Sequence, residues 1–239
     1  EYAIDYIGPV NGHSLHDMIQ VFEAVKDHNG PIVVHVITKK GKGYAPCEND
    51  HEGYWHGVGP FNPATGKPLH SVPEGYAPWA SVMTSQLIRE AEKNPDIIAI
   101  TPAMANGSKL NSFFAKFPER SFDTGIAEEH AATFASSLAL SGKRPYFVVY
   151  SSFLQRCYDQ INHDICRMDV PVVIGIDHAG LVGSDGETHH GIYDIGLLTA
   201  LPNMILAQPC NAEETMDLLH TAFLQSHPFG IRFCKNVIP

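Results

Sequence analysis

The chain has 239 residues, of which 44% are hydrophobic and 18% are charged, and this balance suits a globular core rather than a disordered chain. The formal net charge of −10 argues against nucleic acid as a partner, and the sequence has no apolar run long enough to cross a membrane, so we expect no membrane partner. Its five cysteines are widely spaced and odd in number, which indicates reduced thiols and a cytoplasmic protein.

The N-terminal part predicts one helix and one strand. Residues 14–28 are amphipathic, with Ser14 as a candidate N-cap and Gly30 as the stop. Residues 31–38 are a β-branched run that is apolar on both faces, which is typical of a parallel strand covered by helices on both sides. One helix and one strand cannot form a domain, so we interpret this part as the end of a larger α/β sheet.

Residues 40–78 are rich in proline and glycine and have no hydrophobic period. Stretches of this kind are usually functional loops or linkers. We therefore predict that residues 1–61 end one domain and carry active-site loops, that 62–77 are a linker, and that 78–239 form a second domain.

From Pro78 onward, predicted helices alternate with short apolar strands. Helices are expected at 78–91 with Pro78 as the first helical residue, at 109–117, 127–140, 153–168 and 211–225, and strands at 97–100, 121–123, 146–150, 172–176, 204–206 and 229–233. This alternation predicts an α/β fold with a doubly wound, mostly parallel sheet.

The stretch from Ser121 to Leu140 reads as a strand, a tight turn at Gly125 and an alanine-rich helix that another element can approach closely. Glu128 falls in the first turn of this helix, where the helix dipole favours a carboxylate. A surface glutamate that merely complements the dipole is the simpler interpretation of this residue on its own.

Chemically reactive side chains follow several of the predicted strands. They are Glu128, then Tyr150, Ser151 and Phe153, then Asp177 and His178 with a glycine-rich loop that holds Asp185, His189 and His190, and finally Arg232. Ligands of open α/β sheets bind at the carboxyl ends of the strands, so these residues predict a small-molecule active site. Tyr150 and Phe153 could instead be core aromatics, and the histidine pair could be solvated.

A metal site is not predicted. His51 to His56 resembles a zinc-protease motif, but its histidines are one residue too far apart and Gly53 lies between them. Asp185, His189 and His190 lack a specific ligand spacing, so a metal-dependent hydrolase that uses this loop is a much weaker alternative.

Four motifs together resemble the 1-deoxy-D-xylulose-5-phosphate synthase family, thiamine-diphosphate enzymes related to transketolase. The motifs are Gly41–Pro46 (GKGYAP), Phe122–His130 (FDTGIAEEH), Tyr150–Gln160 (YSSFLQRCYDQ) and Asp177–His189 (DHAGLVGSDGETH). The resemblance implies the end of a diphosphate-binding domain followed by a pyrimidine-binding domain. It also implies condensation of pyruvate with glyceraldehyde 3-phosphate, with loss of CO2, for isoprenoid and thiamine biosynthesis, and a homodimer.

The resemblance also implies roles for the site residues. Glu128 would hydrogen-bond the cofactor's aminopyrimidine, Phe153 would stack on it and Tyr44 would contact the cofactor; His56, Tyr150, Asp185 and His189 would handle substrate and protons; Arg232, His178, Tyr150 and Ser151 would bind substrate.

Two features depart from the family pattern. His178 stands where the family has an arginine that helps to hold the acceptor phosphate. The family's motif for the diphosphate and Mg²⁺ is absent, so we expect the metal ligands outside this sequence. A non-catalytic or split-subunit module with a dimerisation or binding role is the alternative function.

Overall fold

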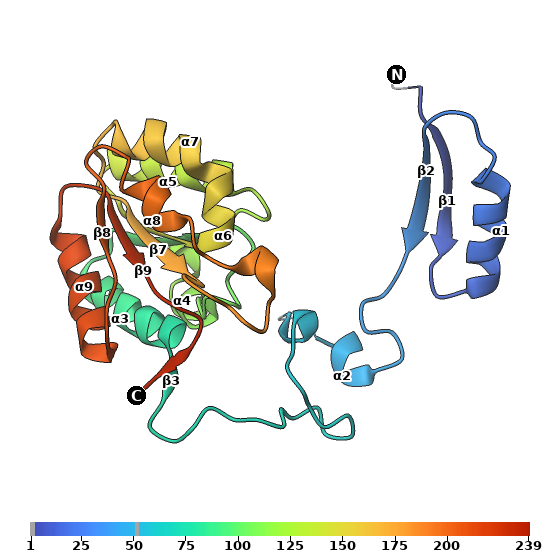
Figure 1. Cartoon of the computed structure of the whole chain (residues 1–239), viewed down its shortest axis with the longest axis horizontal. Coiled ribbons are helices and arrows are strands. Elements are labelled where there is room, and N and C mark those ends of the chain that lie inside the picture. Colours follow the sequence, from blue (N-terminus) through green and yellow to red (C-terminus); the bar gives the residue numbers. More distant parts are fainter. Residues whose placement is uncertain (1–2, 51–52) are drawn as a thin grey trace. The chain divides into compact units, whose positions relative to one another are not determined.

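The computed structural model describes residues 3–50 and 53–239. The chain divides into two compact units, 1–71 and 72–239, and the division falls inside the stretch 62–77. Figure 1 shows the elements of each unit. Within the described residues, no helix combines the length and the apolar character that crossing a membrane would take.

The N-terminal unit is built around two parallel strands, β1 (Asp5–Asn11) and β2 (Ile32–Ile37), joined by helix α1 (Leu15–Val25). Ser14 caps α1, because its side chain accepts a hydrogen bond from the backbone N–H of Asp17. Strand β1 was not predicted, so the expectation of a single strand here was wrong. Its register shifts between Ile7 and Val10, and the intervening Gly-Pro pair breaks the alternation that marks a strand.

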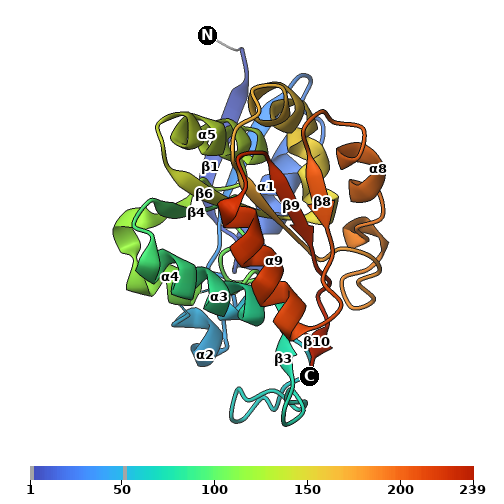
Figure 2. The ribbon, with the colours of Figure 1, turned by 90° about the vertical axis from the view of Figure 1, so that its left-hand side faces the viewer.

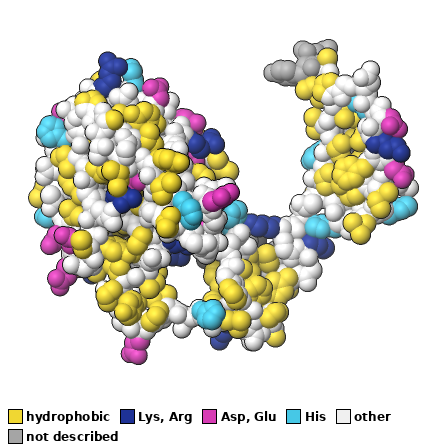
Figure 3. Space-filling view, viewed as in Figure 1, with side chains coloured by type: hydrophobic (Ala, Val, Ile, Leu, Met, Phe, Trp, Pro, Cys, Tyr) yellow, Lys and Arg dark blue, Asp and Glu magenta, His cyan; other side chains and the backbone are white. Residues whose placement is uncertain are grey.

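The apolar face of α1 is exposed within this unit. Leu15, Ile19 and Phe22 are 79%, 56% and 53% exposed, and Figure 3 shows apolar side chains on the surface of the unit. Further along, the described residues of the unit form short elements, the helix α2 (Ala45–Glu48) and a 3-10 turn at Tyr54–His56.

The C-terminal unit has a six-stranded sheet in the order β5-β4-β6-β7-β9-β8, in which every neighbouring pair is parallel. The strands are β4 (Ile97–Thr101), β5 (Ser121–Asp123), β6 (Arg144–Tyr150), β7 (Val173–Asp177), β8 (Ile205–Ala207) and β9 (Phe229–Arg232). A small antiparallel pair, β3 (Ala77–Pro78) and β10 (Val237–Ile238), lies outside this sheet. The predicted α/β fold with a mostly parallel sheet is confirmed.

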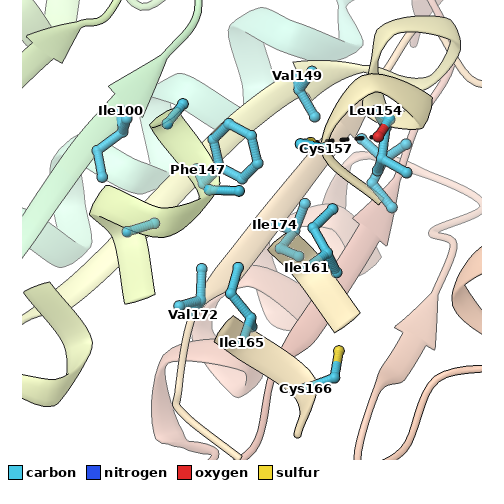
Figure 4. Packing of buried hydrophobic residues seen from close by; sticks show 14 of the residues in the cluster. Ile100, Phe147, Val149, Leu154, Cys157, Ile161, Ile165, Cys166, Val172 and Ile174 are labelled. Carbon is cyan, nitrogen blue, oxygen red and sulfur yellow. Dashed lines mark hydrogen bonds between the residues drawn. The ribbon is translucent and has the colours of Figure 1, made fainter. Parts of the chain in front are cut away.

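Helices cover both faces of the sheet. The main ones are α3 (Trp79–Lys93), α4 (Asn111–Lys116), α5 (Glu128–Leu140), α8 (Asp194–Leu198) and α9 (Ala212–Leu224). Helices α3 and α9 pack side by side on one face, as Figure 2 shows. On the other face α5, α8 and the segment 151–166 pack over alternate strand residues such as Phe147, Val149 and Ile174 (Figure 4).

Residues 153–168 were predicted as one helix, but the structure divides them. They run through α6 (Ser151–Leu154), a 3-10 turn (Gln155–Cys157), α7 (Tyr158–Gln160) and a π-helical turn (Ile161–Cys166). Two smaller differences are that Pro78 lies in β3 while α3 begins at Trp79, and that α8 was not predicted.

Candidate active site

The carboxyl ends of the central strands meet at one edge of the sheet. Tyr150 of β6 lies opposite Asp177 of β7, and Ile176 of β7 lies opposite Arg232 of β9. Because these strands are parallel neighbours, the residues that follow them are placed at a common edge.

Glu128 is the first residue of α5 and is 2% exposed. Its Oε2 lies 2.8 Å from Nε of Arg156, a side chain that is itself 49% exposed. Within the described part of the chain this oxygen nevertheless accepts no hydrogen bond, so the contact with Arg156 is an ion pair only. Arg156 Nη2 also lies 3.7 Å from Oε1 of the neighbouring Glu129. The result is a buried carboxylate at a helix N-terminus with capacity for a donor.

Cys157 follows Arg156 and is fully buried. Burial raises the pKa of the Cys157 thiol well above its usual range, and the charges of Glu128 and Glu129 raise it further. The thiol donates to the backbone oxygen of Leu154 at 3.3 Å, which Figure 4 marks by a dashed line. Cys157 is therefore a protonated core residue and not a nucleophile beside Glu128.

An aromatic cluster joins four of the predicted site residues. The ring of Tyr150 stacks on His178, with centroids 3.7 Å apart, and on Phe153, with centroids 5.9 Å apart. Phe153 in turn makes an edge contact with His189 at 5.4 Å. Burial raises the pKa of the Tyr150 hydroxyl, and the charges of Asp177 and Asp185 add to this effect, so Tyr150 stays a hydrogen-bond donor.

His178 is held by acidic groups on two sides. Asp177 Oδ1 accepts from the backbone N–H of His178 at 2.6 Å and lies 2.9 Å from its Nδ1. Nε2 lies 3.6 Å from Oδ2 of Asp185. Lys235 Nζ contacts both oxygens of Asp185, at 2.5 and 2.6 Å.

Ser151 lies behind this cluster and is 1% exposed. Its hydroxyl and that of Ser152 have no hydrogen-bond partner among the described residues. A Cβ on Gly191 would lie 2.5 Å from Ser151 Cβ, so only glycine fits against this serine. Buried hydroxyl groups without partners suit a ligand-binding surface.

Arg232 contacts residues that are not part of the aromatic cluster. Its Nε and Nη2 pair with Asp194, at 2.8 and 3.3 Å, and Nη1 donates to Gln208. The Asp194 side chain is fully buried and that of Arg232 is 12% exposed. The charge of this arginine is therefore already matched by one carboxylate.

Tyr44 and His56 lie in the N-terminal unit. Tyr44 packs edge-on against Trp55, with centroids 5.2 Å apart, and its buried hydroxyl has no hydrogen-bond partner in the described part of the chain. His56 Nδ1 lies 2.7 Å from Lys40 Nζ. The motif that begins at His51 includes residues 51–52, which lie outside the described residues. The described residues contain no group of three or more His, Cys, Asp or Glu side chains placed to hold a metal.

Three residues that contact the candidate site residues were not predicted from the sequence: Arg156, Asp194 and Lys235. Arg156 stands inside the motif at 150–160, three residues after Phe153, and that position was its only signal. The pairings of Asp194 and Lys235 join residues that are 38 and 50 positions apart, and no local pattern encodes them.

The close packing of Gly107 against Tyr150 gives a direct prediction. A Cβ on Gly107 would lie 1.7 Å from the Tyr150 hydroxyl, so Gly107→Ala must displace this ring. We expect the substitution to lower the free energy of unfolding by about 1–3 kcal/mol, the usual cost of overpacking. Gly196→Ala is the control, because its Cβ would meet no atom within 4 Å and alanine favours the helix α8. Chemical denaturation of both variants tests the prediction, which is contradicted if they are equally stable.

Comparison with known proteins identifies the family. Residues 76–239 match the family model "Transketolase, pyrimidine binding domain", and residues 1–38 match the model "1-deoxy-D-xylulose-5-phosphate synthase". A 1-deoxy-D-xylulose-5-phosphate synthase from Listeria monocytogenes is 50% identical over 100% of this chain and 39% of its own length. One from Geobacillus thermodenitrificans is 47% identical over 99% of this chain and 38% of its own length. The chain thus spans less than half the length of these relatives.

Two solved structures share the fold. A protein described as "Split gene transketolase, inactive beta4 tetramer" aligns with a TM-score of 0.61 and 29% identity, over 68% of this chain and 52% of its own. A transketolase mutant from Pichia stipitis aligns with a TM-score of 0.63 and 16% identity, over 72% of this chain and 28% of its own, which shows likeness of fold alone. The family-model match covers most of the chain, and the chain therefore belongs to the transketolase pyrimidine-binding domain family, with similarity to 1-deoxy-D-xylulose-5-phosphate synthases along its whole length.

Proposed function

We propose that this chain supplies the pyrimidine-binding half of an active site that condenses pyruvate with glyceraldehyde 3-phosphate to 1-deoxy-D-xylulose 5-phosphate and CO2. The observation that carries the proposal is Glu128, a 2% exposed carboxylate at the start of α5 whose Oε2 accepts no hydrogen bond from the described residues. The ring nitrogen of an aminopyrimidine can share a proton with such a carboxyl group, and the amino group can donate a hydrogen bond to it. A synthase that is 50% identical to this chain supports the choice of this reaction.

The described residues fit the pyrimidine end of thiamine diphosphate. Glu128 offers a buried oxygen, Phe153 offers a half-buried ring for stacking, and the hydroxyl groups of Ser151 and Ser152 are unpaired. When bound, thiamine diphosphate supplies the carbanion chemistry that joins two carbonyl compounds. The task of Glu128 is to share a proton with the pyrimidine ring nitrogen, which a buried position at a helix N-terminus serves well because water cannot compete for it.

The other residues bind substrate and move protons. Tyr150 remains protonated and donates a hydrogen bond to a substrate oxygen, while Asp185 and His189 accept or return protons on the same loop. We assign His56 of the N-terminal unit to proton handling as well, and Tyr44 to cofactor contact.

Arg232, His178 and Ser151 are assigned to substrate binding. Arg232 is the guanidinium proposed for the acceptor's phosphate, and Asp194 fixes its orientation. The contacts of Arg232 and His178 do not by themselves indicate phosphate binding, because both side chains already face carboxylates. The assignment therefore rests on the family resemblance. We further propose Mg²⁺ with ligands outside this chain, a homodimer, and a cytoplasmic location.

A split-subunit module is the second candidate function. One protein with the same fold is described as a split-gene transketolase in an inactive tetramer, and it is 29% identical to this chain. In this alternative the chain assembles with a partner that carries the diphosphate site, or serves in assembly alone.

Calorimetry with thiamine diphosphate and Mg²⁺ tests the proposed function. We expect tight binding and pyruvate decarboxylation from a protein in which this chain is joined to, or mixed with, a diphosphate-binding domain of a relative. Binding without turnover in every such combination would favour the non-catalytic module, and a purified chain that contains stoichiometric zinc would favour the hydrolase.

A further inference from the structure

The carboxylate of Asp185 is contacted by Lys235 and by His178, and Lys235 has no role assigned so far. Lys235 lies just beyond β9, and its Nζ contacts both carboxylate oxygens of Asp185 and the Ser184 hydroxyl. His178 Nε2 also lies 3.6 Å from Oδ2, a distance for an ionic contact and too long for a hydrogen bond. The loop that carries Asp185 is thus tied to two different strands of the sheet.

His178 is in turn fixed from behind. Asp177 is 1% exposed, and its Oδ1 lies within hydrogen-bond distance of both the backbone nitrogen and Nδ1 of His178. The ring is also stacked on Tyr150 at 3.7 Å, and the backbone of His178 is left-handed, with φ of 56°. An imidazole held at its ring face, its backbone and one nitrogen cannot turn away from Asp185.

We propose that Lys235 and His178 are positioning residues that clamp Asp185 as a carboxylate at the edge of the active site. This inference deepens the proposed function, on which the catalytic use of Asp185 rests, but the clamp itself requires no cofactor. It gives His178 a second role beside the substrate binding proposed above, and it gives Lys235 its first role.

The electrostatics agree with this geometry. Burial opposes ionisation of Asp185, but the hydrogen bond and charge of Lys235, with a smaller contribution from His178, outweigh it and keep the pKa of Asp185 below its usual range. The charged and titratable groups that face Asp185 are Lys235 beyond β9, His178 beyond β7 with Asp177 behind it, and Tyr150 at the end of β6. Loss of the Lys235 ammonium removes the largest favourable contribution, so the carboxylate should protonate at higher pH.

The test is a pH titration of the aspartate side-chain carboxyl groups by carbon-13 NMR in the full 239-residue chain, with Asp185 assigned from the Asp185→Asn variant. We expect Lys235→Met to raise the titration midpoint of Asp185 by about half a pH unit or more, which is modest because the pair is partly solvated. Lys235→Arg should restore the low midpoint, since arginine keeps the charge and the donors. His178→Gln should raise the midpoint by a smaller amount.

Lys143→Met is the matched control. Lys143 pairs with Asp96 at 2.8 Å and is 43% exposed, close to the 39% of Lys235. This variant removes an ammonium group of similar exposure elsewhere on the surface, so it should leave the titration midpoint of Asp185 unchanged. The proposal is overturned if Asp185 titrates at the same pH in the Lys235→Met variant and in the unaltered chain while circular dichroism shows both to be folded. Because the titration is measured without cofactor, this outcome is independent of whether the proposed reaction occurs.

Discussion

Replacement of Glu128 by glutamine is expected to reduce turnover of the cofactor-loaded enzyme by about 100-fold or more, the scale at which a positioned proton-transfer group contributes. The carbonyl oxygen of glutamine still accepts a hydrogen bond, but the amide cannot take or release a proton. Glutamine is nearly isosteric with glutamate, and Oε2 accepts no hydrogen bond from the described residues, so the substitution should leave the fold unchanged although it removes the ion pair with the half-exposed Arg156.

Glu129→Gln is the matched control for this variant. Glu129 is the next residue of α5, is 46% exposed, and lies 3.7 Å from the same arginine. Its replacement removes an equal charge from the same region but leaves the buried carboxylate in place, so turnover should stay within a few-fold of the unaltered enzyme. Steady-state kinetics on the enzyme that carries this chain, with melting temperatures for each variant, make the comparison. Near-normal turnover by Glu128→Gln would remove Glu128 from the proton-transfer role.

The sheet could be predicted from the sequence because its strands are short apolar runs that alternate with helices. All six predicted strands of the C-terminal unit are present, with ends that differ by at most two residues. Strand β1 was not predicted because Gly8 and Pro9 interrupt it and because its partner strand is known only once the chain is folded. Periodicity along one segment carries no information about the segment that lies beside it.

The division of residues 151–166 into α, 3-10 and π-helical turns could not be predicted for a different reason. Leu154, Cys157, Ile161 and Ile165 are all fully buried, and their spacing of three, four and four residues is that of an ordinary α-helix. The change between 3-10, α and π hydrogen bonding preserves the buried face, so hydrophobic period cannot detect it. Turns of π-helix often occur near functional sites, and this one follows the segment that carries Arg156.

The strand-end positions of the candidate site residues in the C-terminal unit were expected from the rule that ligands bind at the carboxyl ends of parallel strands, but their pairings were not. The family resemblance suggested Arg232 as a substrate-binding residue, and the structure pairs its guanidinium with Asp194. The sequence suggested His178 as a substitute for an arginine, whereas the structure sets it between Asp177 and Asp185. Such pairings depend on side chains brought together across the sheet edge, and the roles proposed for these residues now have to include their partners.

The Arg232–Asp194 pair leads to the second large effect. Asp194→Ala is expected to lower the free energy of unfolding by about 3–5 kcal/mol, because it leaves a largely buried guanidinium without its carboxylate. The contact with Gln208 cannot compensate, since an amide oxygen carries no charge. Asp217→Ala on the exposed side of α9 is the control and should change the stability by no more than about 0.5 kcal/mol.

A double variant separates the cost of an unpaired charge from the net value of the pair. Asp194→Leu combined with Arg232→Met removes both charges and keeps apolar volume, and such replacements are often neutral or stabilising. We therefore expect the double variant to be more stable than Asp194→Leu alone, with a coupling energy of about 1–3 kcal/mol in the cycle of the unaltered chain, Asp194→Leu, Arg232→Met and the double variant. Urea denaturation of the four proteins measures this. If Asp194→Ala and Asp217→Ala are equally stable, Arg232 does not depend on Asp194, and its guanidinium would be free to bind a substrate phosphate without competition from that carboxylate.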